Sequence, residues 1–310
     1  MSVSRREFLN ASSFALAGAA AWRVPLAGQT PQTTPPAAPA ATPKFEDVRR
    51  NVGIFTARGG TIGWLALPDG ALAVDSQYAE TAPACIDGLK AKSPKGIDML
   101  INTHYHADHT GGNAAFRPVV KTIVQQEKCA KLHKETTEKA GTAAQQAYAD
   151  LTFGESWSRT LGDEKIWAFY YGPGHTGGDA IVVFEKANVV HMGDLMFNRV
   201  HPRVDIPSGA SIKNWIGVLE KVAKKHSDAT FIFGHSKAAT PLTGPAKELL
   251  YFRDYLSAVM DHVSKGIKAK QTKEQIVAAT ALPGFAEHAS SGQVLTLAGV
   301  LGSAYDELSK

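Results

Sequence analysis

Residues 102–113 of the chain read NTHYHADHTGGN and directly follow the apolar run Ile97–Ile101, which is typical of a buried strand. Side chains alternate along an extended chain, so the first two histidines of this stretch point the same way. The two glycines allow the backbone to turn into a helix that we expect to begin near Asn113. The stretch therefore aims imidazoles and a carboxylate at one point from the end of a strand, and it offers four candidate metal ligands: His104, His106, Asp108 and His109.

Three further positions along the chain have the same local pattern, in which a short apolar run is followed by a glycine and then a ligand-type side chain. These positions are His175, Asp194 and His235. Open α/β folds build their sites from residues at strand ends, so the series predicts a single metal site at one sheet edge. Imidazole and carboxylate ligands without thiolate favour zinc, with iron and manganese as alternatives.

The alternation of apolar runs and turn residues predicts an α/β fold with sheets inside and helices outside. Turn residues such as Gly59-Gly60 separate the first strands, which indicates an antiparallel meander. The expected strands span residues 52–56, 62–67, 71–74, 97–101, 119–124, 165–171, 180–184, 189–192 and 230–233. The expected helices span residues 80–92 and 211–225, a long helix or helix pair covers 125–148, and further helices follow residue 245.

This arrangement resembles the metallo-β-lactamase superfamily over roughly residues 50–240. The resemblance implies a four-layer αββα sandwich with a C-terminal helical extension, and a site for two zinc ions. Carried onto this chain, it implies three sets of ligands: His104, His106 and His175 for the first metal, Asp108, His109 and His235 for the second, and Asp194 as a bridge between them. Asp75 matches a carboxylate that supports the metal ligands in relatives, and a turn-forming aspartate is the alternative.

The same resemblance implies the chemistry. Two divalent ions lower the pKa of a shared water, and the metal-bridging hydroxide attacks an ester, thioester, lactone or amide bond of a small-molecule substrate. Asp108 would be the catalytic residue that orients the hydroxide and passes a proton to the leaving group. Asp194 favours the branches that resemble glyoxalase II and the lactonases, because dedicated β-lactamases of this fold usually carry another residue there.

Two other functions stay open on the sequence. One is a periplasmic metallo-β-lactamase that hydrolyses β-lactams, and the other is a non-catalytic, metal-bound accessory or carrier protein. The loop after Asp194 carries His201 and Arg203, either of which could hold an anionic group of the substrate. Solvated loop residues are the alternative explanation for both.

The N-terminus has the layout of an export signal. Arg5 and Arg6 precede the apolar run Ala11–Ala21, which resembles a twin-arginine signal. We therefore expect export by the twin-arginine (Tat) translocase to the periplasm or the medium, and no later run is long enough to span a membrane. The expected domains are a signal peptide over 1–28, a Pro/Ala/Thr-rich linker over 29–44, a catalytic domain over 45–243, and C-terminal helices packed on the sandwich over 244–310.

Charge and cysteine content narrow the functional classes further. The chain has 33 lysines and arginines against 29 aspartates and glutamates, for a net charge of +4. It has no block of like charges that could follow a phosphate backbone, so nucleic acid is not expected as a partner. Cys85 and Cys129 are too few for a disulfide scaffold and lack metal-site spacing, so we expect core residues, with a single disulfide as the alternative in an exported protein.

Overall fold

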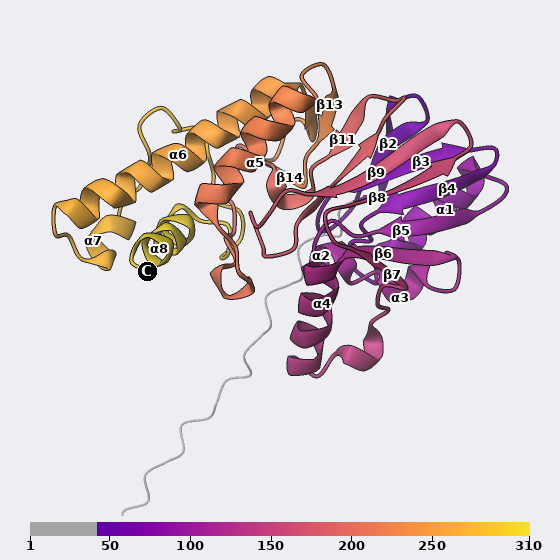
Figure 1. Cartoon of the computed structure of the whole chain (residues 1–310), viewed down its shortest axis with the longest axis horizontal. Coiled ribbons are helices and arrows are strands. Elements are labelled where there is room, and N and C mark those ends of the chain that lie inside the picture. Colours follow the sequence, from indigo (N-terminus) through magenta and orange to yellow (C-terminus); the bar gives the residue numbers. More distant parts are fainter. Residues whose placement is uncertain (1–41) are drawn as a thin grey trace, which may run out of the picture. The chain divides into compact units, whose positions relative to one another are not determined.

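The computed structural model describes residues 42–310, which form two β-sheets with helices on their outer faces (Figure 1). A seven-stranded sheet has the order β1-β2-β3-β4-β5-β6-β7, and a six-stranded sheet has the order β15-β13-β11-β10-β9-β8. The predicted αββα layering with C-terminal helices is confirmed. The expected signal peptide, and the expected linker up to residue 41, lie outside the described residues.

The seven-stranded sheet is antiparallel in its first half and parallel in its second half. Its strands are β1 Lys44–Arg49, β2 Val52–Thr56, β3 Ile62–Leu67, β4 Gly70–Val74, β5 Ile97–Ile101, β6 Thr122–Gln126 and β7 Leu151–Phe153. The predicted meander is present as β2, β3 and β4. Because β4 and β5 are parallel, their carboxyl ends meet at one edge, and Asp75 and the 102–113 stretch emerge there together.

The six-stranded sheet delivers a second set of residues to the site. Its strands are β8 Ser156–Leu161, β9 Glu164–Tyr170, β10 Ala180–Phe184, β11 Val189–His191, β13 Thr230–Ile232 and β15 Thr243–Gly244. Strands β11 and β13 are parallel, so the segments that carry Asp194 and His235 leave the sheet at the same edge. A short parallel ribbon of β12 (Phe197–Asn198) and β14 (His235–Ser236) then joins these two segments.

Helices cover the outer face of each sheet. They are α1 Ala82–Lys92, α2 Ala107–Thr110, α3 Asn113–Phe116, α4 Glu127–Lys139, α5 Ile212–Lys225, α6 Ala246–Lys268, α7 Lys273–Val277 and α8 Leu297–Leu308, with short 3-10 turns at Ala143–Gln145, Gly193–Leu195 and Ile206–Ser208. Helices α1 and α3 pack on the seven-stranded sheet. Helices α5 and α6 share an apolar cluster with the six-stranded sheet, α7 and α8 pack against α6, and the core between the sheets is apolar. Burial of these apolar side chains therefore holds the two sheets together, and with them the two sheet edges that meet at the site.

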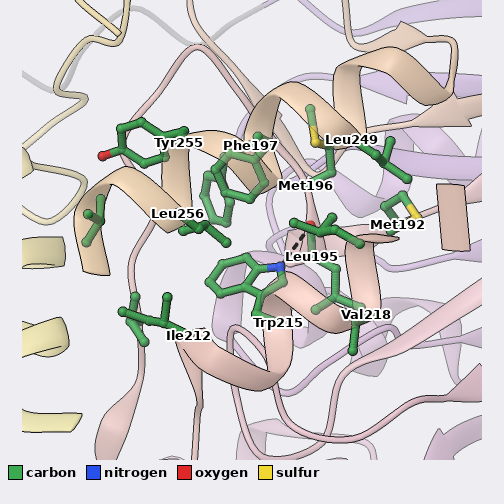
Figure 2. Packing of buried hydrophobic residues seen from close by; sticks show 14 of the residues in the cluster. Met192, Leu195, Met196, Phe197, Ile212, Trp215, Val218, Leu249, Tyr255 and Leu256 are labelled. Carbon is green, nitrogen blue, oxygen red and sulfur yellow. Dashed lines mark hydrogen bonds between the residues drawn. The ribbon is translucent and has the colours of Figure 1, made fainter. Parts of the chain in front are cut away.

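The apolar layer beneath the helices also fixes the segment around Asp194. Trp215 of α5 is fully buried, and its indole Nε1 donates a hydrogen bond to the carbonyl oxygen of Leu195 at 3.0 Å. Figure 2 shows this contact, with Phe197 and the α6 residue Leu256 packed close to the indole. Aromatic packing of this kind contributes several kcal/mol when the side chains are buried, so the backbone next to Asp194 has little freedom.

The expected long helix or helix pair over residues 125–148 is present only as α4 and a short 3-10 turn. Residues up to Gln126 belong to β6, and the Gln126 side chain accepts hydrogen bonds from the backbone N–H groups of Lys128 and Cys129, which starts α4. Helix α4 ends at Lys139, and Gly141 follows with a positive φ of 69°. Strands β1, β7 and β8 were also not expected from the sequence. Strand β8 is an edge strand with mostly exposed side chains, so it has no apolar run that would reveal it.

Both cysteines are buried and free, which confirms the prediction of core residues. Among residues 42–310, no helix combines the length and apolar character that crossing a membrane requires.

Arg199 connects the β12–β14 ribbon to the C-terminal helices. It lies in the left-handed region (φ 61°), with its guanidinium 3.7 Å from the centroid of the Tyr251 ring on α6. Its Nη1 is 2.9 Å from Glu248 Oε2, and its Nε is 2.9 Å from Glu287 Oε1. The Arg199 side chain is 19% exposed, so water screens these pairs only in part.

We expect Arg199→Ala to lower the free energy of unfolding by about 2 kcal/mol, because it removes two ion pairs and a cation–π contact at once. Urea unfolding of the metal-free protein measures this change. Arg159→Ala, which alters an exposed arginine on β8, serves as the control. Equal losses in the two variants would contradict a role for Arg199 in holding the C-terminal helices.

Candidate metal centre

The structure brings three imidazoles together at the shared sheet edge. His104 and His106 follow β5, and His175 follows β9. Nδ1 of His106 lies 3.2 Å from His104 Nε2 and 2.9 Å from His175 Nε2. All three side chains are at least nine-tenths buried. Three ring nitrogens therefore face one point in a protected environment.

Asp194 lies between these imidazoles and a second group. Its Oδ2 is 3.4 Å from His175 Nε2 and 3.3 Å from His235 Nε2. Its Oδ1 is 3.1 Å from His109 Nε2. One buried carboxylate thus faces imidazoles that come from both sheets.

The second group contains Asp108, His109 and His235. Asp108 and His109 lie on the short helix α2, and His235 opens β14. Asp108 Oδ2 is 3.2 Å from His235 Nε2 and 3.6 Å from His109 Nε2. Ligand atoms of these three residues lie within 4.8 Å of one another, as do those of His104, His106, His175 and Asp194. The seven predicted ligands therefore form two adjoining groups that could each hold a metal ion.

The electrostatics differ between the two groups. Burial lowers the pKa of His175 to about 3 and holds the pKa of His104 well below its usual value, so both imidazoles are neutral and keep a free lone pair. Neutral imidazole is the form that binds a metal ion.

In the second group, carboxylates dominate the electrostatics. Burial alone would lower the pKa of His235, but Asp194 and Asp108 raise it to about 9. Burial alone would raise the pKa of Asp194, but His235 and His109 hold it well below its usual value. The two carboxylates are therefore ionised and attract positive charge to this position.

The residues present fit metal ions. His109 Nε2 and Asp194 Oδ1 are buried and face each other at 3.1 Å, but the contact lacks hydrogen-bond geometry, and neither atom has another hydrogen-bond partner among the described residues. Such atoms cost free energy unless a ligand or ion satisfies them. The backbone also makes room, because a Cβ on Gly234 would lie 2.2 Å from Asp194 Oδ1, and one on Gly60 would lie 2.1 Å from the His109 ring.

Asp75 lies directly behind the second group and is fully buried. Its Oδ2 is 2.7 Å from His109 Nδ1, which leaves Nε2 of that ring facing Asp194. The same carboxylate accepts hydrogen bonds from the backbone N–H and the hydroxyl of Thr103. Asp75 therefore orients one predicted ligand and ties it to the end of β5.

Two carboxylates that the sequence analysis did not single out also support predicted ligands. Asp205 Oδ2 is 3.0 Å from His106 Nε2 and accepts a hydrogen bond from the Tyr105 hydroxyl. Asp179 accepts hydrogen bonds from the backbone N–H groups of Gly174 and Thr176, on either side of His175. Asp179 could have been found as an acceptor close to a Gly-rich turn, but no local signal links Asp205 to a histidine 99 residues away.

The two loop residues predicted to contact the substrate lie in different surroundings. His201 is buried, and its Nδ1 is 2.7 Å from the hydroxyl of Tyr255 on α6. Arg203 lines a cavity of about 350 Å³ that also contacts His106 and Asp108. Of the two side chains, only that of Arg203 borders this cavity.

An αββα sandwich with histidines and aspartates gathered at one sheet edge defines a class of metal-dependent proteins. A family model for the metallo-beta-lactamase superfamily matches residues 57–235, more than half of the chain, and the chain belongs to this family. The predicted family is therefore confirmed, and the protein is a metallo-hydrolase of this superfamily.

Individual relatives come from several branches. The chain is 26% identical to a probable metallo-hydrolase of Methanocaldococcus jannaschii over 53% of this chain and 82% of that protein. It is 30% identical to a hydroxyacylglutathione hydrolase of Crocosphaera subtropica over 40% of this chain and 42% of that protein. The solved structure of a metallo-beta-lactamase from Pontibacter korlensis shares the fold, with a TM-score of 0.58 and 17% identity over 70% of this chain and 99% of that chain.

Proposed function

We propose that the protein is an exported hydrolase with two zinc ions that cleaves an ester, thioester, lactone or amide bond of a small molecule. The position of Asp194 carries this proposal, because one carboxylate faces two adjoining groups of imidazoles at 3.1 to 3.4 Å. Bound zinc would supply the acidity that makes water a nucleophile at neutral pH, and iron or manganese could supply the same chemistry.

We assign one proposed metal ion to each of the two groups of residues. His104, His106 and His175 would hold the first ion, Asp108, His109 and His235 would hold the second, and Asp194 would contact both. Asp75 would keep His109 in the tautomer that presents Nε2 to the metal. Export rests on the twin-arginine pattern of residues 1–28, which would take a folded, metal-loaded protein through the Tat translocase to the periplasm or the medium.

Asp108 is the proposed catalytic residue. Its side chain is 23% exposed and borders the cavity, whereas that of Asp194 is 4% exposed. A carboxylate that touches both the ligand group and the cavity is placed to accept a proton from attacking water and to return it to the leaving group. The neighbouring imidazole of His109 keeps the pKa of Asp108 well below its usual value although burial opposes this, so the carboxylate is ionised.

A β-lactamase is the second candidate, favoured by the shared fold with the Pontibacter korlensis enzyme. The deciding assay compares a chromogenic cephalosporin with ester, thioester and lactone substrates, using the zinc-loaded protein and a chelator-treated control. Fast, chelator-sensitive opening of the cephalosporin would establish the β-lactamase. Turnover of an ester, thioester or lactone alone would establish the leading proposal.

Asp108→Asn tests whether the protein is a catalyst. We expect turnover to fall by at least about 100-fold, because the amide has the same shape but cannot carry the proton. Metal analysis of the same variant should still find the zinc ion held by the first group. Asp69→Asn changes an exposed carboxylate in the turn between β3 and β4 and should leave turnover unchanged. Ligand binding without turnover in both wild type and Asp108→Asn would instead favour the accessory or carrier protein.

A further inference from the structure

Four polar side chains form a hydrogen-bonded chain that runs from the segment with the predicted ligands to the wall of the cavity of about 350 Å³. They are Asn102 after β5, Gln125 of β6, His133 of α4 and Gln146 after the 3-10 turn that follows α4. The first three are fully buried, and Gln146 lines the cavity. A backbone carbonyl group at the buried end sets the direction of every hydrogen bond in this chain, because a carbonyl oxygen can only accept.

The carbonyl oxygen of His109 accepts a hydrogen bond from Asn102 Nδ2 at 3.0 Å, which turns the amide oxygen of Asn102 the other way. That oxygen accepts a hydrogen bond from Gln125 Nε2 at 2.9 Å. Asn113 exchanges a pair of hydrogen bonds with the Asn102 amide, in the directions that this orientation requires. An amide nitrogen carries two hydrogens and accepts nothing, so the second hydrogen of Gln125 Nε2 is available to His133.

His133 passes this direction on to the cavity wall. Its Nδ1 is 3.3 Å from Gln125 Nε2, and its Nε2 is 3.3 Å from Gln146 Oε1. Because the Gln125 nitrogen can only donate, Nδ1 of His133 accepts. Burial lowers the pKa of His133, so the imidazole is neutral and carries its one proton on Nε2. His133 therefore donates a hydrogen bond to the amide oxygen of Gln146.

Gln146 consequently offers the cavity its amide nitrogen. Its oxygen is engaged by His133, and its Nε2 makes no hydrogen bond to another group of residues 42–310. The backbone next to it is also held, since Asn113 Nδ2 donates a hydrogen bond to the carbonyl oxygen of Ala147 at 3.1 Å. Other residues of this wall, such as Thr136 and Ala140, are uncharged. A fixed, neutral donor in a cavity selects ligands that carry an acceptor.

We propose that Gln146 is a specificity-determining residue that binds an uncharged carbonyl oxygen of the substrate, outside the scissile bond, and that His133 is the positioning residue that keeps the Gln146 amide nitrogen facing the cavity. This inference rests on the proposed function, since it takes the scissile bond to lie at the metal centre. The same cavity contacts His106 and Asp108, so one small molecule can reach both the candidate metal centre and Gln146. An anion at this wall would lose hydration without gaining an opposite charge, which favours a neutral acceptor.

The orientation of the Gln146 amide can be tested in the metal-free protein. Nitrogen-15 NMR of the full chain, labelled at its histidines, reports which ring nitrogen carries the proton, and a His133→Gln variant identifies the signals of His133. We expect the proton on Nε2. A proton on Nδ1 would reverse the hydrogen-bonded chain and turn the oxygen of Gln146 to the cavity, which would overturn the inference.

Simple thiols test substrate binding without turnover. The full chain is loaded with Co²⁺, whose thiolate complexes absorb light, and is titrated with N-acetyl aminothiols in which two, three or four methylene groups join the thiol to the amide. Each is compared with a hydrocarbon thiol of the same length and branching, which lacks the carbonyl group. The readout at each length is the ratio of the dissociation constant of the hydrocarbon thiol to that of the amide thiol.

We expect Gln146→Met to lower this ratio by about fivefold at the length that fits best, which is the size of one neutral hydrogen bond. Methionine keeps the length of the side chain but has no N–H group. His133→Phe should lose part of the preference, because the freed amide can rotate. Gln145→Met alters the exposed glutamine next in the chain and should leave the ratio unchanged. The ratio cancels changes in cobalt affinity, so a weakened metal centre does not imitate the effect.

Two results would overturn the inference while leaving the proposed function intact. Gln146→Met could keep the wild-type ratio at all three lengths, which would remove Gln146 as a specificity residue, or His133→Phe could keep the full ratio, which would remove His133 as its positioning residue. A different result would overturn both: a folded wild-type protein, checked by circular dichroism, that binds no Co²⁺ or gives no thiolate absorption with any thiol.

Discussion

Replacing Asp194 by alanine is expected to lower the affinity of both metal positions and to abolish hydrolysis. Its carboxylate lies 3.1 to 3.4 Å from imidazoles of both groups, so under the proposed function its removal would take one ligand from each position. It also leaves His109 and His235 in a buried site without the negative charge that now balances them. Mutation of a residue that only supports a metal ligand typically costs about 10- to 100-fold in affinity, so loss of one of the four proposed direct ligands at each position is expected to cost at least about 100-fold.

Metal analysis of the purified variant, together with titration by a competing chelator, measures the effect. Asp228→Ala removes an exposed carboxylate after α5 and should retain the wild-type metal content. Asp194→Asn keeps the shape and one ligand oxygen, so its losses should be smaller than those of the alanine variant. Wild-type metal content and affinity in Asp194→Ala would show that this carboxylate does not join two metal positions.

Replacing Asp75 by alanine is expected to destabilise the metal-free fold by about 4 kcal/mol, which is within the range for breaking a fully buried, hydrogen-bonded charge. Asp75 accepts hydrogen bonds from the backbone N–H and hydroxyl of Thr103, and it faces Nδ1 of His109 at 2.7 Å. In the variant these buried donors lose their acceptor.

Urea unfolding of metal-free wild type and variant measures this loss, and unchanged m-values would show that both unfold the same surface. Asp75→Asn is the informative comparison, because the amide oxygen can still accept from Thr103 while the charge beside His109 is gone. A loss below about 1 kcal/mol in Asp75→Ala, the size of an ordinary substitution, would contradict this account of the site.

The local parts of the site were predictable because they follow from short-range geometry. Alternation along an extended chain brings His104 and His106 to one side, and the glycines before His175 and His235 mark where strands end. Strands such as Ile62–Leu67 and Ala180–Phe184 are buried, so their apolar runs reveal them, and the structure has them with the predicted bounds. A buried strand has a run of apolar residues that can be recognised in the sequence. The exposed edge strand Ser156–Leu161 has no such run.

Contacts between distant segments could not be predicted in this way. Asp205 meets His106 across 99 residues, and the sequence around each gives no sign of the other. From the sequence, both His201 and Arg203 were predicted to contact the substrate. In the structure His201 contacts Tyr255 of α6, and only Arg203 borders the cavity. Which of the two loop residues faces the site depends on which one is buried against α6, and this is set by how the helices pack.

By itself, the sequence determined the family of the fold, the types of ligand and the strand ends from which they emerge. The family resemblance implied Asp194 as a bridge and Asp75 as a supporting carboxylate. Only the tertiary structure decided the distances at which they lie, that Asp205 orients His106, and that Arg203 borders the cavity. The reason is physical. Strand periodicity and glycine turns are set by neighbouring residues, whereas the distances between ligands depend on how two sheets and their helices bury a common core.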